Sequence, residues 1–417
     1  MVKGLSKILI WFLCLISFVS LAESQINKVS DLENYKESGI EHMKNGNYTE
    51  AVEDFTSAIH LDPKDIEAYV NRALAHYKLG NMFSAIQDYD KIISINSRSP
   101  EIYMLRAQVK VAAGLEEEAI EDYGKVLLFE PENHKAYYHR GVLYNMSGFY
   151  EYALFDFKKC IKYSPTGEVF YMVGFLESRL GRDIHALIYL KNAIEAEPTN
   201  IRYILTKIRC LNRLGKHDEA LTDLNHALSK NKNNTELLTE RGITFHYLRK
   251  YDKGLSDFNA AAKKDPGYFD IYPSRARTLI MLGKYDQVID DYNKIIELKP
   301  DYMDGYLNRA NCFIKLDKYK EAIADLSKYI ELNEYNFSIY IKCAECYLEI
   351  GDELAALSDF NKAIELKPDY PVAFYLRGKA HLKLNDVENA CSDYNTSLEM
   401  GFEIRNPTDS SLFTTCK

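Results

Sequence analysis

Hydrophobic and small residues recur along this chain at an interval of 34 positions. The clearest markers are four glycines that stand one interval apart: Gly46, Gly80, Gly114 and Gly148. A ruler of 34 places that starts at Leu32 divides the chain, as far as Ile404, into eleven windows with the same pattern. A fixed period of this length indicates an array of short structural repeats.

Each window predicts two amphipathic helices. The fourth place is large in every window, and the eighth is small in ten of eleven, with Ile208 as the exception. The twentieth place is usually Ala and is followed four residues later by a large side chain, as in Ala51 and Phe55, so both lie on one helix face. The first helix ends at glycine in eight windows, which suits a left-handed helix end. The second ends near a proline in seven windows, because proline lacks the N–H that would continue the helix: Pro63, Pro131, Pro165, Pro198, Pro266, Pro300 and Pro368.

The paired helices predict the fold class. Two helices of this length cannot bury their apolar faces alone, so neighbouring windows must stack into one continuous core. We therefore expect an all-α solenoid of about eleven helix-turn-helix repeats over residues 32–404, with a linker over 23–31 and a tail over 405–417. The register loses one residue near 166–169, between Pro165 and Phe170. Windows five and six are the least regular, and we interpret them as a junction within one array rather than as a domain boundary.

The combination of a large residue at place four, a small one at eight, Ala at twenty, an aromatic at twenty-four and Pro at thirty-two resembles the tetratricopeptide repeat. The chain has Tyr where that family often has Trp at place four, as at Tyr69 and Tyr103, which keeps an aromatic ring. The resemblance implies a right-handed superhelix. It also implies an inner groove that is lined by the first helix of each pair and receives peptides or partner helices.

Charged residues repeat with the same period. An Arg stands at place seven in seven windows: Arg72, Arg106, Arg140, Arg241, Arg275, Arg309 and Arg377. An Asp stands at place twenty-three in ten windows: Asp54, Asp88, Asp122, Asp156, Asp223, Asp257, Asp291, Asp325, Asp359 and Asp393. Carboxylates repeated in nearly every window favour a structural ladder of Arg–Asp hydrogen bonds over catalytic pairs. Window five loses both partners together, with Val173 and Tyr189 in their places, as a paired role requires.

A candidate binding surface lies on the first helices of windows four and five. The inner places of these helices bring four large residues onto one surface: Tyr138, Val142, Tyr171 and Phe175. Aromatic residues that packing does not require are typical of binding hot spots. The alternative is that these rings pack against their neighbours in the core. If they bind a partner, replacing Tyr138 and Phe175 by Ala should weaken binding and leave the melting curve nearly unchanged.

Composition and charge narrow the class of partner. The chain has 52 basic and 61 acidic residues, a net charge of −9, and the two signs are interspersed. With no basic stripe to hold a phosphate backbone, we expect no nucleic-acid partner. The ten histidines form no His-Glu-x-x-His motif, and no phosphate-binding loop or Gly-x-Ser-x-Gly motif is present. We therefore expect no catalytic residues, no metal and no cofactor, and other proteins or peptides as partners.

The first 22 residues differ from the rest of the chain. Lys3 and Lys7 precede an apolar stretch from Ile8 to Leu21, which small residues follow at Ala22. This pattern predicts a signal peptide over residues 1–22 that is removed after Ala22. A retained membrane anchor is the alternative, although the stretch is shorter than the ~20 apolar residues that span a bilayer. We thus expect export to a periplasm or the exterior, or alternatively to the lumen of the endoplasmic reticulum, with no membrane span after cleavage.

The cysteines divide into two groups. Cys343 and Cys346 form a Cys-x-x-Cys pair in mid-helix, where thiolates are not activated, and we predict that they and Cys160, Cys210 and Cys312 are core residues. The last repeat and tail resemble the ending of exported bacterial repeat proteins of the Bacteroidetes type. That resemblance implies a disulfide between Cys391 and Cys416 that holds the tail. Cys391 as a plain core residue stays open, because one pair of cysteines does not determine connectivity.

Three functional hypotheses follow. The first is an exported scaffold that is not an enzyme and binds partner proteins or peptides in its groove. The second is a co-chaperone of the endoplasmic reticulum that holds unfolded chains. The third is a non-catalytic subunit that positions an exported enzyme.

Overall fold

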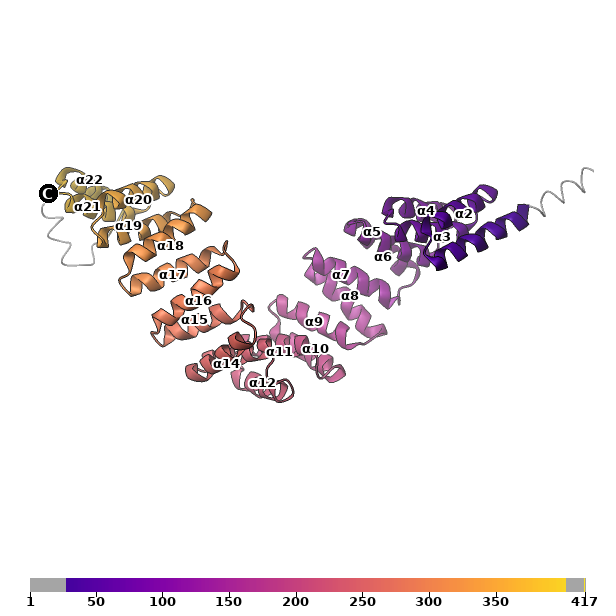
Figure 1. Ribbon diagram of the computed structural model, residues 1–417, viewed down its shortest axis with the longest axis horizontal. Coiled ribbons are helices and arrows are strands. Elements are labelled where there is room, and N and C mark those ends of the chain that lie inside the picture. Colours follow the sequence, from indigo (N-terminus) through magenta and orange to yellow (C-terminus); the bar gives the residue numbers. More distant parts are fainter. Residues whose placement is uncertain (1–27, 403–415, 417) are drawn as a thin grey trace, which may run out of the picture. The chain divides into compact units, whose positions relative to one another are not determined.

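The computed structural model describes residues 28–402 and 416, and this part of the chain consists of helices joined by short turns. A helix over residues 28–45 comes first, and 21 helices, α2 to α22, follow it in antiparallel pairs that succeed one another in chain order within each unit (Figure 1). The all-α class and the arrangement in about eleven helix pairs are thereby confirmed. The signal peptide at 1–22 lies outside the described residues, as does the tail at 405–417 except for Cys416.

The bounds of the helices follow the windows. The first helices of the pairs after the initial one are α3 (Ile66–Lys78), α5 (Pro100–Ala112), α7 (His134–Met146), α9 (Gly167–Arg179), α11 (Ile201–Arg213), α13 (Thr235–Tyr247), α15 (Ile271–Met281), α17 (Met303–Lys315), α19 (Phe337–Glu349) and α21 (Pro371–Lys383). The second helices are α2 (Tyr48–Leu61), α4 (Met82–Ile95), α6 (Glu116–Phe129), α8 (Tyr150–Tyr163), α10 (Asp183–Ala196), α12 (His217–Lys230), α14 (Tyr251–Lys264), α16 (Tyr285–Leu298), α18 (Tyr319–Leu332), α20 (Glu353–Leu366) and α22 (Val387–Glu399).

The helix over residues 28–45 begins before the expected position. It includes residues 28–31, which we assigned to a linker, so the described part of that linker is helical. These four residues contain neither Gly nor Pro, and Leu32, one residue further on, packs against the core of the first repeats. The helix is therefore free to extend toward the N-terminus from its anchored turn.

The turn inside each pair requires a left-handed residue at place fifteen. Eight of these positions are glycines, including Gly46 and Gly351, with φ between 69° and 82°. Arg249, Asp317 and Asn385 stand at the same place with φ of 56°, 56° and 61°. The tertiary structure thus imposes this conformation even where the residue has a Cβ that opposes it.

Close helix packing explains the small residue at place eight. A Cβ added to Gly39 would lie 2.8 Å from the Phe55 ring, and one added to Gly242 would lie 2.7 Å from Phe258. Window six has the opposite arrangement, with the larger Ile208 at place eight and Leu224, instead of an aromatic residue, at place twenty-four. Both side chains are fully buried. The two places therefore share one volume of the core.

Tyrosine at place four also has a polar role. The Tyr272 hydroxyl donates to the Pro266 carbonyl at 2.7 Å, and the Tyr306 hydroxyl donates to the Pro300 carbonyl at 3.0 Å. These bonds connect the start of one pair to the turn that ends the previous pair. A hydroxyl at the ring edge is what allows Tyr to replace a larger aromatic here.

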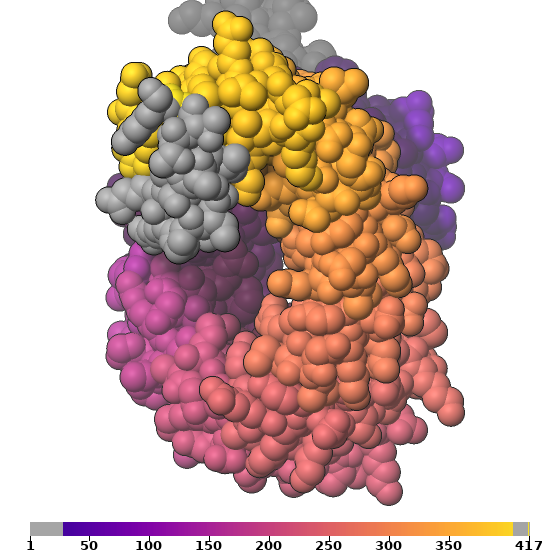
Figure 2. Space-filling model, turned by 90° about the vertical axis from the view of Figure 1, so that its left-hand side faces the viewer, coloured from indigo at the N-terminus to yellow at the C-terminus, as the bar shows by residue number. Residues whose placement is uncertain are grey.

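The contacts divide the chain into two compact units, Met1–Tyr203 and Ile204–Lys417. The division falls inside α11, in window six, one of the two windows that we predicted to be irregular. The lost residue lies in the turn between α8 and α9, where Thr166 caps α9 by accepting from the Val169 N–H at 3.3 Å. In the second unit, the repeats stack in chain order toward the C-terminal helices (Figure 2).

Candidate functional site

The predicted aromatic surface lies on α7 and α9 in the first unit. Tyr171 and Phe175 lie on α9 with ring centroids 5.9 Å apart. Tyr203 stacks on Tyr171 at 4.8 Å, and the Arg202 guanidinium lies 4.4 Å from the centroid of the same ring. Tyr171 is only 6% exposed as a result. Its ring is therefore largely covered by the chain itself.

The other three predicted residues are half-buried and pack against the core of the first unit. Tyr138 presents its ring edge-on to the buried Phe157 at 5.7 Å. Val142 lies one turn further along α7, and both it and Phe175 contact the same core. Burial raises the pKa of the Tyr138 hydroxyl, and the nearby Glu168 carboxylate acts in the same direction. The four residues thus form a surface whose aromatic rings already contact the core of the first unit on one side.

The predicted ladder residues connect the first and second helices of their pairs. Each of the seven arginines donates from Nε and Nη2 to the carboxylate of its own window, with donor–acceptor distances between 2.5 and 3.2 Å: Arg72–Asp88, Arg106–Asp122, Arg140–Asp156, Arg241–Asp257, Arg275–Asp291, Arg309–Asp325 and Arg377–Asp393. Such forked pairs have defined geometry as well as charge attraction. Burial raises the pKa of the Asp156 carboxyl, although the Arg140 guanidinium acts in the opposite direction.

The same arginines also connect neighbouring windows, which the sequence pattern did not reveal. In six cases, the Nη1 atom donates to a side chain sixteen residues earlier, in the preceding second helix: Thr56, Asp90, Asn225, Asn259, Asn293 and Asn361. Arg140 is the exception, because the corresponding residue is Gly124. Each complete set therefore joins two helix pairs through one guanidinium.

Three predicted aspartates have other partners, because place seven does not carry Arg in their windows. Asp54 accepts from the Ser38 hydroxyl at 2.7 Å and lies 3.0 Å from His42 Nδ1. Asp223 pairs with Lys207 at 2.7 Å. Burial raises the pKa of the Asp359 carboxyl, and a hydrogen bond from the Cys343 thiol opposes this. The ladder is thus interrupted in windows one, six and ten, and in window five, which has neither partner.

The cysteines divide as expected. Cys391 and Cys416 form a disulfide, with a Cα–Cα distance of 5.2 Å and a sequence separation of 25. Closing a loop of this length contributes roughly 3 kcal/mol by restricting the unfolded chain. The other five described cysteines are buried thiols outside any disulfide, and burial raises the pKa of the Cys346 and Cys312 thiols to about 11. Such thiols stay protonated at neutral pH and are poor nucleophiles.

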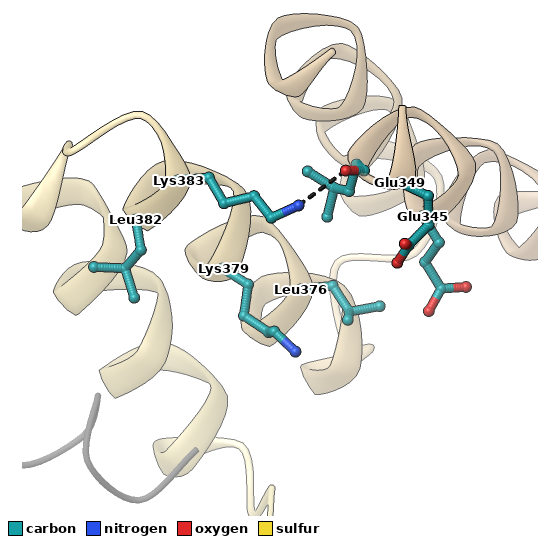
Figure 3. Close-up of a pocket in the computed structure, with 7 residues that line it drawn as sticks. Glu345, Glu349, Leu376, Lys379, Leu382 and Lys383 are labelled. Atoms are coloured by element: carbon teal, nitrogen blue, oxygen red, sulfur yellow. Dashed lines mark hydrogen bonds between the residues drawn. The ribbon is translucent and has the colours of Figure 1, made fainter. Parts of the chain in front are cut away.

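A pocket that the sequence analysis missed lies in the second unit, between the first helices of windows ten and eleven (Figure 3). Its volume is about 420 Å³, and it is lined by Glu345, Leu348 and Glu349 of α19 and by Leu376, Lys379, Leu382 and Lys383 of α21. This volume lies within the range of small-ligand and peptide side-chain sites. The three leucines are half-buried, so part of each remains available to a ligand.

The charges in this pocket are separated by helix. Glu345 and Glu349 stand on α19, whereas Lys379 and Lys383 stand on α21 and extend toward it (Figure 3). The Lys383 ammonium donates to the Leu348 carbonyl at 2.9 Å, which defines its position. Although Glu345 reaches solvent, packing desolvates its carboxyl enough to raise its pKa, and Lys342 and Lys379 act in the opposite direction. One wall is therefore acidic and the other basic.

The sequence did contain a signal for this pocket. Glu345 and Lys379 are 34 residues apart, as are Glu349 and Lys383, so the same two places carry acids in one window and bases in the next. We considered place nine only in windows four and five, where it is Val142 and Phe175, and did not consider place thirteen. Comparing those places in every window would have indicated a charged site.

Among the described residues, no group of three or more His, Cys, Asp or Glu side chains could hold a metal ion, and no catalytic domain is identified. Likewise, within this part of the chain, no helix has both the length and the apolar character needed to cross a membrane.

Five segments match models of one repeat family. Residues 39–80 match the model described as TPR repeat, and residues 66–99, 304–336, 337–370 and 372–400 match the model described as tetratricopeptide repeat. The last two segments contain the pocket residues of α19 and α21. No curated protein matches the chain in sequence.

Several solved structures are similar to this chain. YrrB, described as a TPR protein with an unusual peptide-binding site, is 24% identical over 45% of this chain and 97% of its own, with a TM-score of 0.41. A tetratricopeptide repeat protein from Parabacteroides merdae is 23% identical over 60% of this chain and 98% of its own, with a TM-score of 0.39. Yeast Tom70 is 15% identical over 92% of this chain and 94% of its own, with a TM-score of 0.38. At these identities the likeness is one of fold alone.

Proposed function

Because this chain is a tetratricopeptide-repeat protein, we propose that it is a non-catalytic scaffold that holds a peptide segment of a partner protein against its first helices. The observation that carries the proposal is the pocket between α19 and α21. Its leucines offer an apolar floor, and its charged residues stand at the rim. Ligand-binding sites usually consist of an apolar concave surface with a few polar groups around it.

The composition of the pocket favours peptide binding over catalysis. Its residues are carboxylates, ammonium groups and leucines, and all four charged side chains belong to repeat positions on two stable helices. The Lys383 ammonium is already held by a backbone carbonyl, which gives it a fixed place rather than the freedom of a proton shuttle. Rigid helices that present apolar contact with a polar rim favour recognition of a segment of chain.

We also propose that the protein acts after export. The support is the pattern of Lys3, Lys7 and the apolar stretch that ends near Ala22. A disulfide at Cys391 and Cys416 is consistent with an oxidising compartment. N-terminal sequencing of native protein should find Glu23 first, and an intact Met1 would contradict this part of the proposal.

Binding is tested with a peptide library rather than with an unknown partner. Full-length mature chain is immobilised, and a random dodecapeptide library is selected against it. The selected peptides are then cross-linked to two variants that carry p-benzoylphenylalanine, Glu349→p-benzoylphenylalanine in the pocket rim and Leu354→p-benzoylphenylalanine on α20. Leu354 is 71% exposed and does not line the pocket, so it is the matched control.

The expected result is cross-linking at position 349 and little at position 354. Equal labelling of both positions, or selected peptides that label neither, would remove the pocket as the binding site. The variant Y138A/F175A serves as a second comparison, because its residues lie on the aromatic surface of α7 and α9 in the first unit. Loss of peptide binding in this variant alone would transfer the proposed site to that surface.

A further inference from the structure

The pocket between α19 and α21 is electrostatically polar, because its two walls carry opposite charge. Places nine and thirteen are Glu345 and Glu349 on one wall and Lys379 and Lys383 on the other. Leu348 of α19 and Leu376 of α21 provide the apolar floor of the pocket, and Leu382, which also lines it, packs against the C-terminal core as well. A ligand that crosses the pocket from α19 to α21 therefore meets a negative potential first and a positive potential second.

The positions of the charges are defined by the fold. The Lys383 ammonium has one of its three N–H groups directed at the Leu348 carbonyl, 2.9 Å away. The Lys379 ammonium lies 5.5 Å from the centroid of the Tyr375 ring, which is itself 7% exposed and packed in the C-terminal core. The basic wall is thus held in place before a ligand arrives, which lowers the entropic cost of binding.

The acidic wall remains more open. Glu345 and Glu349 are exposed at the surface of α19, one turn apart. Desolvation raises the pKa of the Glu345 carboxyl, Lys342 and Lys379 oppose this, and Glu349 adds to it as a neighbouring like charge. A basic side chain from a ligand would add to the attraction that these two lysines already supply.

From this arrangement we infer that the pocket binds a dipolar peptide segment, in which an apolar side chain occupies the leucine floor between a basic residue on the α19 side and an acidic residue on the α21 side. The inference rests on the proposed function and adds the chemistry and the orientation of the ligand. Complementary charge determines orientation and discriminates against the wrong partner more than it adds affinity. The same feature separates this pocket from a purely apolar groove, which would accept a segment in either direction.

The probes are three labelled octapeptides with the same frame and the same apolar centre. The first is acetyl-Gly-Ser-Lys-Leu-Leu-Glu-Ser-Gly-amide, the second exchanges Lys and Glu, and the third replaces both by Gln. Binding to the full chain is measured by fluorescence anisotropy at low and moderate ionic strength. One charged peptide should bind about tenfold more tightly than the Gln peptide, the other charged peptide should bind less tightly than the first, and added salt should reduce the preference.

The variant that tests orientation exchanges the walls: E345K/E349K/K379E/K383E. It should invert the preference between the two charged peptides, because the potentials are reversed while the leucines are unchanged. K379Q/K383Q removes one wall and should abolish the preference. The control K253Q/K320Q removes two exposed lysines elsewhere and should keep it. Melting curves establish that each variant is folded, and K379R/K383R, which retains the charge, should behave as the parent chain.

Equal binding of the three peptides by the parent chain would overturn the inference, as would an unchanged preference in the wall-exchanged variant. These results differ from failure of the proposed function. If library-selected peptides cross-link at position 349 but none of them depends on charge, the pocket binds peptides and the dipolar inference is wrong. If no selected peptide labels the pocket at all, the proposed site is wrong and the inference fails with it.

Discussion

Two pairs of first helices, α7 with α9 and α19 with α21, show the same repeat positions used in different ways. Tyr138 and Val142 on α7 correspond to Ile341 and Glu345 on α19. Tyr171 and Phe175 on α9 correspond to Tyr375 and Lys379 on α21. The first pair is covered by aromatic rings that contact one another and the core, whereas the second leaves a pocket with charged walls.

The framework around the two regions is nearly the same. Arg140 holds Asp156 in window four as Arg377 holds Asp393 in window eleven, with donor–acceptor distances of 2.7 to 2.8 Å in both. Small residues at Gly141 and Gly378 let the helices approach in both. The comparison teaches that places seven, eight and twenty-three maintain the helix pair, while places five, nine and thirteen are free to vary the surface.

The largest expected effect concerns the framework that the two regions share. The variant R140A leaves the Asp156 carboxylate, which is fully buried, without its forked partner. We expect a loss of about 3–5 kcal/mol in the free energy of unfolding, measured by urea denaturation, because an unpaired buried charge is costly. The control K191A removes the exposed pair with Glu195 and should cost less than about 1 kcal/mol. Equal losses in the two variants would mean that the ladder is not structural.

The next effect distinguishes a packed ring from a binding residue on α9. Tyr171 is stacked on Tyr203 and covered by Arg202, so we expect Y171A to lower the free energy of unfolding by about 3 kcal/mol. Peptide binding at α19 and α21 should be unaffected. Thermal denaturation and peptide anisotropy on the same sample separate these results. Unchanged stability would mean that Tyr171 does not contribute to packing and can contact a partner.

A smaller, favourable effect is expected where the ladder is interrupted in the pocket region. Window ten has Cys343 at place seven, opposite Asp359, and Ser327 stands sixteen residues earlier as a possible second acceptor. The variant C343R restores the forked pair and should raise the free energy of unfolding by about 1 kcal/mol. The conservative variant C343S should give no such gain. A loss in C343R would show that the thiol is required by local packing.

The smallest expected effect is a pH dependence of folding stability in the aromatic region. Burial lowers the pKa of His139 on α7, with Lys135 acting in the same direction, and the ring stacks on Tyr123 at 5.7 Å. His139 therefore binds a proton more readily in the unfolded chain than in the folded one. Its contribution to folding stability is complete above the ordinary pKa of histidine and is lost as the pH falls below that value. Protection factors of the α7 amides, which correct hydrogen exchange for its intrinsic pH dependence, should be lower at pH 5.5 than at pH 7.5. The variant H139Q should reduce this difference, and H185Q, at an exposed histidine, should leave it unchanged.

The sequence was sufficient for the framework of this protein. A period of 34 residues, with Gly or Ala at place eight and a large side chain at place twenty-four, permits one arrangement of paired helices, because each pair must bury its apolar face on the next. Arg and Asp sixteen residues apart were recognisable as partners, because they recur and because window five loses both. These features are local or strictly periodic, so one chain contains many copies of the evidence.

Only the tertiary structure decided what the surfaces do. Whether Tyr171 faces a partner or is covered by Tyr203 depends on contacts across neighbouring windows, and the period carries no information about them. The bond from Nη1 of six ladder arginines to the preceding helix was likewise not predictable from the pattern, because its acceptor varies among Thr, Asp and Asn. The pocket is lined by Leu348 and Leu382 at the places where α7 and α9 have Asn145 and Ser178, and helix packing brings two walls of opposite charge beside them. Helices form from local pattern, but a cavity is defined by the residues that neighbouring helices do not fill.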